Sequence, residues 1–185
     1  MNIHQLSVSF DERQDRLLLR LSTQAHEEFR FWLTRRMTSR LLPTLEKCVV
    51  RLEASQPGVA APDPGSQQML SELKRDAFMQ KADFSTPFAS QTPVLPLGSE
   101  PLLVTDAHFN LESGGALRIQ LLEKSPGVTD KSCQMNLQAA LVHGLVHLIR
   151  QALGQTGWAM GLEAAADVQS TAPEESSEPT TRYAH

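Results

Sequence analysis

Two histidines spaced by four residues carry the clearest metal-ligand spacing in this chain. His143 and His147 lie in the segment VHGLVH. On a helix, side chains at positions i and i+4 share one face, so both imidazoles could contact one metal ion. Gly144 occupies the position at which a glutamate could serve as general base, and no third ligand follows downstream. The pair is therefore a candidate metal site, but we expect no metal and no other cofactor.

A second group of residues suits binding rather than catalysis. The segment FRFWLTRRMTSRLLPTLE, residues 29–46, holds two phenylalanines, a tryptophan and four arginines. On a helical wheel, part of this set lies opposite an apolar stripe. Tryptophan and arginine are the residue types most enriched at interface hot spots. The predicted binding surface consists of Phe29, Trp32, Arg35, Arg36 and Arg40.

Three interpretations of that surface stay open. A protein interface is the first, with a homodimer or another protein as partner, because homodimers are the commonest oligomers. Nucleic-acid binding is the second, since arginine beside aromatic rings suits single strands. The third is intramolecular packing under the short helix that follows, in which Arg36 and Arg40 pair with Glu72 or Asp76.

Enzyme classes find little support in the motifs. The chain has no G-x-S-x-G, no P-loop and no G-x-G-x-x-G. We therefore expect a non-enzymatic soluble protein that acts through a protein-protein interface and self-associates. The alternative is a nucleic-acid-binding protein that uses the same face. A metal-dependent enzyme at His143 and His147 ranks third.

Charge is distributed unevenly along the 185 residues, which sum to a net charge of −4. Residues 29–52 hold six cations and one acid, whereas residues 155–185 hold five acids and one base. No run of about 18 apolar residues occurs, so we expect no membrane span. The N-terminus lacks a signal-peptide pattern, which favours the cytoplasm. Cys48 and Cys133 have apolar neighbours and are expected as buried free thiols.

Hydrophobic periodicity predicts the elements of the first half. Residues 3–10 alternate apolar and polar, and residues 16–22 read as a returning strand of a hairpin. A long helix is then expected from about residue 25 to about 53, with Leu41 and Leu45 central in its core stripe. Pro43 lies inside that pattern and should kink or restart the helix.

The second half repeats the order of the first. A proline-rich linker at 54–65 leads to a short amphipathic helix at 66–82, and a second linker covers 84–101. A hairpin at 102–112 and 116–124 follows, with Gly114 and Gly115 in its turn, and a second long helix is expected at 132–154.

These elements predict an α+β domain over residues 1–154. Two ββα units, joined by a helical insert, suggest an internal duplication in topology. They should form one antiparallel sheet of about four strands with helices on one face. Residues 155–185 lack periodicity and are expected to be an acidic, disordered tail.

Overall fold

The chain folds as two units, in each of which three consecutive antiparallel strands lead into a helix, and one additional short strand precedes the three in the second unit. The computed structural model describes residues 3–54, 63–82, 88, 94–127 and 129–158. The first unit contains β1 (Ile3–Asp11), β2 (Arg16–Thr23), β3 (Glu28–Thr34) and α1 (Arg35–Ala54). The helix α2 (Pro64–Lys81) separates it from the second, which contains β4 (Leu102–Leu103), β5 (Asp106–Leu111), β6 (Ala116–Glu123), β7 (Lys131–Gln138) and α3 (Ala139–Leu153).

The strands form two sheets, and these confirm the predicted α+β class and its four-stranded sheet. One sheet has the order β1-β2-β3-β4, and the other has the order β5-β6-β7. All pairings are antiparallel except that of β3 with β4. The expectation that both hairpins share one sheet is wrong. The chain changes partners between β4 and β5: the amide of Val104 still donates to Trp32, whereas that of Thr105 donates to Leu122 of β6.

The first long helix begins about ten residues later than predicted. Residues 28–34 form β3 instead, and its alternating side chains place Phe31 and Leu33 in the core. Aromatic and β-branched residues favour a strand when a partner strand is available, and β2 supplies one along this whole segment. The Oγ1 atom of Thr34 accepts from the amide of Met37 at 3.2 Å, which caps the helix at its observed start.

The second long helix was predicted too early for the same reason. Residues 131–138 form β7, in which Cys133, Met135 and Leu137 are buried and the residues between them are exposed. This alternation has the period of a strand, and it continues from β6 as an antiparallel pair. Helix α3 starts at Ala139, so Leu137 contributes to the core from a strand. In the turn between β5 and β6, Gly115 has a positive φ of 74°, whereas Gly114 does not have a positive φ.

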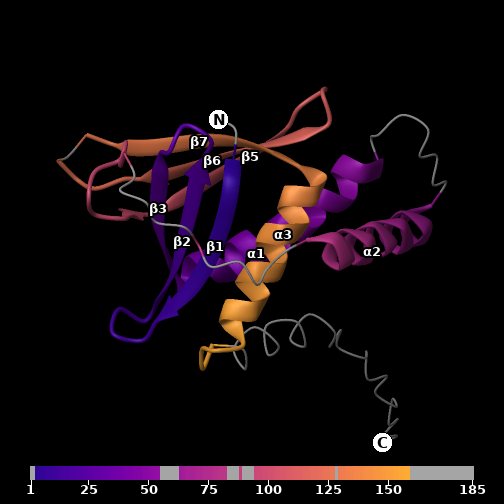
Figure 1. The fold of residues 1–185 in the computed structure, drawn as a ribbon, viewed down its shortest axis with the longest axis horizontal. Helices are drawn as coiled ribbons and strands as arrows, with labels where there is room; N and C mark the ends of the chain where they lie inside the picture. The colour runs from indigo at the N-terminus through magenta and orange to yellow at the C-terminus, as the bar shows by residue number, and fades with distance from the viewer. Residues whose placement is uncertain (1–2, 55–62, 83–87, 89–93, 128, 159–185) are drawn as a thin grey trace, which may run out of the picture.

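Each long helix packs against strands of the other unit as well as its own. Helix α3 packs along β1, and α1 packs over β5 and β6, while the two helices also contact each other. Figure 1 shows the two sheets crossing, α1 and α3 side by side next to them, and α2 beyond these helices. One hydrophobic cluster therefore draws side chains from both sheets and both long helices.

The predicted core stripe of the first helix is confirmed in α1. Leu41 and Leu45 are 3% and 0% exposed. Pro43 lies on the exposed side, and α1 runs from Arg35 to Ala54 as one helix without restarting there. Among the helices that the structure describes, none combines the length and apolar composition needed to cross a membrane.

Residues that follow α3 still belong to the folded body. Trp158 is 4% exposed and packs edge-on against Phe10, with ring centroids 5.8 Å apart. Its indole Nε1 donates to Oδ1 of Asp15 at 2.9 Å, in the turn between β1 and β2. Asp15 adopts a positive φ of 48° there. The predicted tail at 155–185 thus includes buried residues at its start, and residues 159–185 lie outside the described part.

Candidate functional site

A row of cations runs along the exposed side of α1. Arg36, Arg40, Lys47 and Arg51 are all exposed, and their spacing of 4, 7 and 4 residues keeps them on one helical face. We call these four residues the α1 ridge. Within the described residues, none of the four forms an ion pair with a carboxylate. Arg35 is also exposed and lies beside the ridge at the start of the helix.

The alternative of intramolecular pairing with α2 is not what the structure shows. Asp76 is bonded to Arg75 of its own helix, with Nη2 3.1 Å from Oδ1. Glu72 accepts from Gln68, also on α2, at 3.4 Å. Arg36 and Arg40 therefore present their charges to the surroundings rather than to these two acids.

The two aromatic members of the predicted surface lie elsewhere, on β3. Phe29 is on the core-facing side, opposite Leu21 of β2, and packs against the hydrophobic core. Trp32 is on the other side of the same strand and is half-buried. The predicted five-residue surface is thus divided, because residues 28–34 alternate as a strand instead of turning as a helix.

Trp32 lies in an apolar row across the outer face of the first sheet. Its partners are Leu18 on β2 and Leu103 on β4. The adjacent row pairs Arg20 with Arg30. These arginines were missed, although the alternation in RLLLRLS and FRFWLT could have placed them on the face with Trp32. Arg30 is bound to the buried carboxylate of Glu28 at 2.7 Å, and Arg20 lies 4.3 Å from the ring centroid of Phe88.

The histidine pair is split between two environments. His143 is 5% exposed and its Nε2 lies 3.0 Å from Oε1 of Glu53, which is 2% exposed. His143 is buried because α1 packs against that side of α3 and supplies this carboxylate. His147 is half-buried one turn later. Among the described residues no group of three or more histidine, cysteine, aspartate or glutamate side chains could hold a metal ion.

A second polar bridge lies one heptad away in both helices. Arg150 of α3 donates to Oε1 of Glu46 of α1, with Nη2 2.8 Å away. Glu46 and Glu53 are seven residues apart, as are His143 and Arg150, but in opposite order. The two bridges therefore fix α1 and α3 as antiparallel neighbours. The Oε2 atom of Glu53 is buried and has no hydrogen-bond partner among the described residues.

A groove lies where α1, α2 and α3 meet. Its volume is ≈ 670 Å³, within the range of small-molecule sites. Helix α2 is capped at its start by Asp63, and its Phe78 ring lies so close to Gly144 of α3 that an added Cβ there would be 3.4 Å from it. Hydrogen bonds from the side chain and amide of Ser66 lower the pKa of Asp63. The lining includes His143, Ser71, Val146, Lys47 and Arg51.

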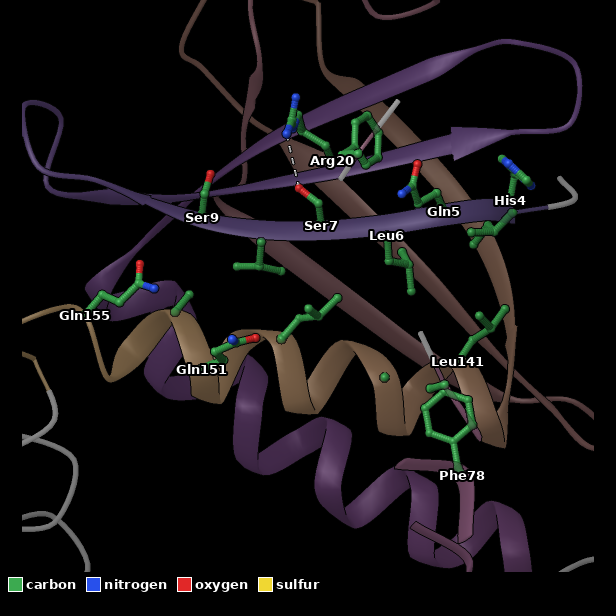
Figure 2. Close-up of a pocket in the computed structure, with 17 residues that line it drawn as sticks. His4, Gln5, Leu6, Ser7, Ser9, Arg20, Phe78, Leu141, Gln151 and Gln155 are labelled. Atoms are coloured by element: carbon green, nitrogen blue, oxygen red, sulfur yellow. Dashed lines mark hydrogen bonds between the residues drawn. The ribbon is translucent and has the colours of Figure 1, made fainter. Parts of the chain in front are cut away.

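A smaller cavity of ≈ 450 Å³ follows β1. In Figure 2, Gln5, Ser7 and Ser9 point to one side of the strand, and Leu6 points to the other, toward α3. The guanidinium of Arg20 donates to Oγ of Ser7 at 3.4 Å on the polar side. Ala82 and Phe88 also line this cavity and flank a stretch outside the described residues, so we assign no site there.

The two thiols are poorly suited to nucleophilic chemistry. Burial raises the pKa of Cys133 to about 11. Burial also raises the pKa of Cys48, against a smaller lowering by the nearby charge of Arg51. Since the thiolate is the reactive form, both side chains stay protonated and unreactive near neutral pH.

Comparisons with protein-family models, with curated proteins and with solved structures gave no match to this chain. The α1 ridge and the groove beside it are therefore interpreted from their own geometry and charge.

Proposed function

We propose that this is a non-enzymatic binding protein whose α1 ridge contacts an acidic protein surface, in the first instance that of a second copy of the chain. The observation that carries the proposal is the row of four exposed cations on one rigid helix, without carboxylate partners in the described part of the chain. The opposite side of the helix is anchored in the core, so the charges are held in fixed register.

Charge complementarity supports a second copy as the partner. Residues 155–185 carry five acids and one base, so each chain contains groups of the sign that the ridge would attract. Complementary charges steer association and fix its register, which is where a fixed row of cations contributes most. The expected contact depends on salt, because exposed charges are screened over about 8 Å at physiological ionic strength.

The double substitution Arg36→Glu/Arg40→Glu tests the ridge. Both side chains are exposed, so the melting temperature should change little. Self-association measured by sedimentation velocity should be lost, because like charges across an interface cost several kcal/mol. The matched control is Arg13→Glu/Lys131→Glu, which makes the same charge change at exposed positions away from α1 and should leave sedimentation unchanged.

Two results would count against the protein interface. A wild-type chain that sediments as a monomer at all concentrations removes self-association. A large loss of melting temperature in the ridge variant, with unchanged sedimentation, would make these arginines structural instead.

Nucleic-acid binding is the second candidate, and the length of the ridge favours it. The sixteen residues of helix from Arg36 to Arg51 span about 22 Å, over which a duplex presents many phosphates. Fluorescence anisotropy with a random oligonucleotide at increasing salt distinguishes this reading. Binding that is steeply weakened by salt and lost in Arg36→Glu/Arg40→Glu would place nucleic acid ahead of protein.

A further inference from the structure

The floor of the groove between α1, α2 and α3 contains buried polar groups. His143 and Ser71 are 5% and 4% exposed, and both line the groove. Buried polar side chains that face a cavity are the groups that fix the orientation of a ligand. The apolar part of the groove lining is formed by Val49, Val50 and Val146. The groove thus combines an apolar body with a few convergent polar atoms.

His143 has one nitrogen available to a ligand. Its Nε2 is engaged by Oε1 of Glu53, and no other hydrogen bond of this ring occurs within the described residues. Nδ1 is therefore the ring nitrogen left for a ligand, and it donates or accepts according to the tautomer. Glu53 also fixes the orientation of the ring, as carboxylates do for histidines at functional sites. A ligand hydroxyl can both donate and accept, so it would complete the hydrogen bonds of this histidine.

The rim of the groove has a pair of cations without carboxylate partners. Lys47 and Arg51 are exposed, one helical turn apart on α1, and both line the groove. The other two arginines of the rim are engaged, Arg75 by Asp76 and Arg150 by Glu46. An anionic group at this rim would therefore be attracted to Lys47 and Arg51 in particular.

We propose that this groove binds a small organic anion that has an apolar body and a hydroxyl group. Its anionic group contacts Lys47 and Arg51, its body packs on the valines, and its hydroxyl forms a hydrogen bond with Nδ1 of His143. This site shares Lys47 and Arg51 with the α1 ridge, whereas Arg36 and Arg40 do not line the groove.

The experiment is an NMR titration of the full chain with three matched probes. The probe 6-hydroxy-2-naphthoate carries the anion, the apolar rings and the hydroxyl. The compound 2-naphthoate lacks the hydroxyl, and 2-naphthol lacks the anion. Saturable shifts of the Val50 and Val146 amides and of the His143 imidazole nitrogens are expected with the first probe. Hydrogen bonds to charged groups predict that 2-naphthol binds about tenfold or more weakly.

Two double variants distinguish the Lys47 and Arg51 pair from the other two cations of the α1 ridge. Lys47→Gln/Arg51→Gln should bring the affinity for 6-hydroxy-2-naphthoate down to that for 2-naphthol. Arg36→Gln/Arg40→Gln removes the same charge from the same helix face and should leave the affinity unchanged. The 2-naphthoate probe should reproduce the amide shifts without the shift at Nδ1 of His143.

The proposal is overturned if millimolar 6-hydroxy-2-naphthoate gives no saturable shift in the groove. It is equally overturned if binding there is indifferent to Lys47→Gln/Arg51→Gln, because the cation pair would then not be the anion site. Loss of binding in Arg36→Gln/Arg40→Gln alone would place the anion site at Arg36 and Arg40, and it would overturn the proposal as well. None of these outcomes bears on self-association, which is measured without any probe.

Discussion

The imidazole of His143 and the carboxylate of Glu53 meet across the contact of α1 with α3, with Nε2 3.0 Å from Oε1 and both side chains almost fully buried. They are 90 residues apart in the chain, so this bond joins the helix of one unit to the helix of the other. The free energy of unfolding should therefore respond very differently to the replacement of one partner of this buried pair and to the replacement of both.

Removing one partner should be costly. His143→Leu leaves the Glu53 carboxylate buried without its partner, and breaking a buried pair in this way costs about 3–5 kcal/mol. The double variant His143→Leu/Glu53→Leu removes both polar groups and should recover most of that loss. Urea denaturation of wild type, the two single variants and the double variant measures the coupling energy between the two side chains. If the losses of unfolding free energy in the single variants simply add in the double variant, the predicted coupling is absent.

The indole of Trp158 should act as an anchor for the end of the folded body. Trp158→Ala removes a buried ring and is expected to cost about 3–5 kcal/mol. Trp158→Phe keeps an aromatic ring against Phe10 but loses the bond to Asp15, which predicts a cost of about 0.5–1.5 kcal/mol. Chemical denaturation measures both. Equal costs for the two variants would show that the hydrogen bond, rather than ring packing, dominates.

Two truncations define where the folded body ends. A chain that stops after Trp158 loses residues 159–185 and should keep its melting temperature within about 5 °C. A chain that stops after Gly154 also loses the buried Thr156 and Trp158, so its melting temperature should fall by more than that. Differential scanning calorimetry compares them. A large drop already in the longer chain would assign a stabilising role to the acidic residues beyond 158.

Leu41 tests the orientation of α1. It is 3% exposed in the core, so Leu41→Ala is expected to cost about 2–5 kcal/mol. The control is Arg40→Ala, one residue earlier on the exposed ridge, which should fall within about 0.5 kcal/mol of wild type. Urea denaturation provides both values. A small effect at Leu41 would require the helix to be rotated, and the ridge with it.

The buried Cys133 thiol should make the free energy of unfolding depend on pH in the alkaline range. Burial raises its pKa from 9.0 to about 11, so the folded state holds the proton more tightly than the unfolded chain does. The resulting contribution to stability is fully present below pH 9 and is lost as the pH rises toward about 11. The free energy of unfolding should therefore fall more steeply over this window in wild type than in Cys133→Ala. Parallel curves for the two proteins would exclude the effect.

Local periodicity was sufficient for part of the fold. The hairpin of β1 and β2, the helix α2, the hairpin of β5 and β6, and the core stripe of α1 all followed from alternation or from helical spacing. The strands β3 and β7 were missed for a common reason. Each is followed without a break by a helix, and their apolar residues can also be placed on a helical wheel. Only a neighbouring strand, which is a feature of the tertiary structure, decides between a strand and a helix at these positions.

The candidate site was predictable to the same extent. Arg36 and Arg40 were expected to lie opposite the core stripe, and both are exposed. Trp32 was grouped with them because a helix was assumed where β3 lies. The bond between His143 and Glu53 had no local signal, since nothing in the spacing of residue 53 points to residue 143. Residues that meet across units can be found only once the packing of α1 against α3 is known.

The exchange of helices between the two units has a consequence during synthesis on the ribosome. β1 emerges before α3, which packs along it and is completed about 140 residues later. At typical rates of about 5–20 residues per second, the apolar side of β1 remains uncovered for roughly 7–28 s. During that interval Leu6 and Val8 are not yet covered by α3 and can contact other nascent chains. The order of the elements thus leaves the apolar side of an early strand uncovered until the last helix of the fold has been made.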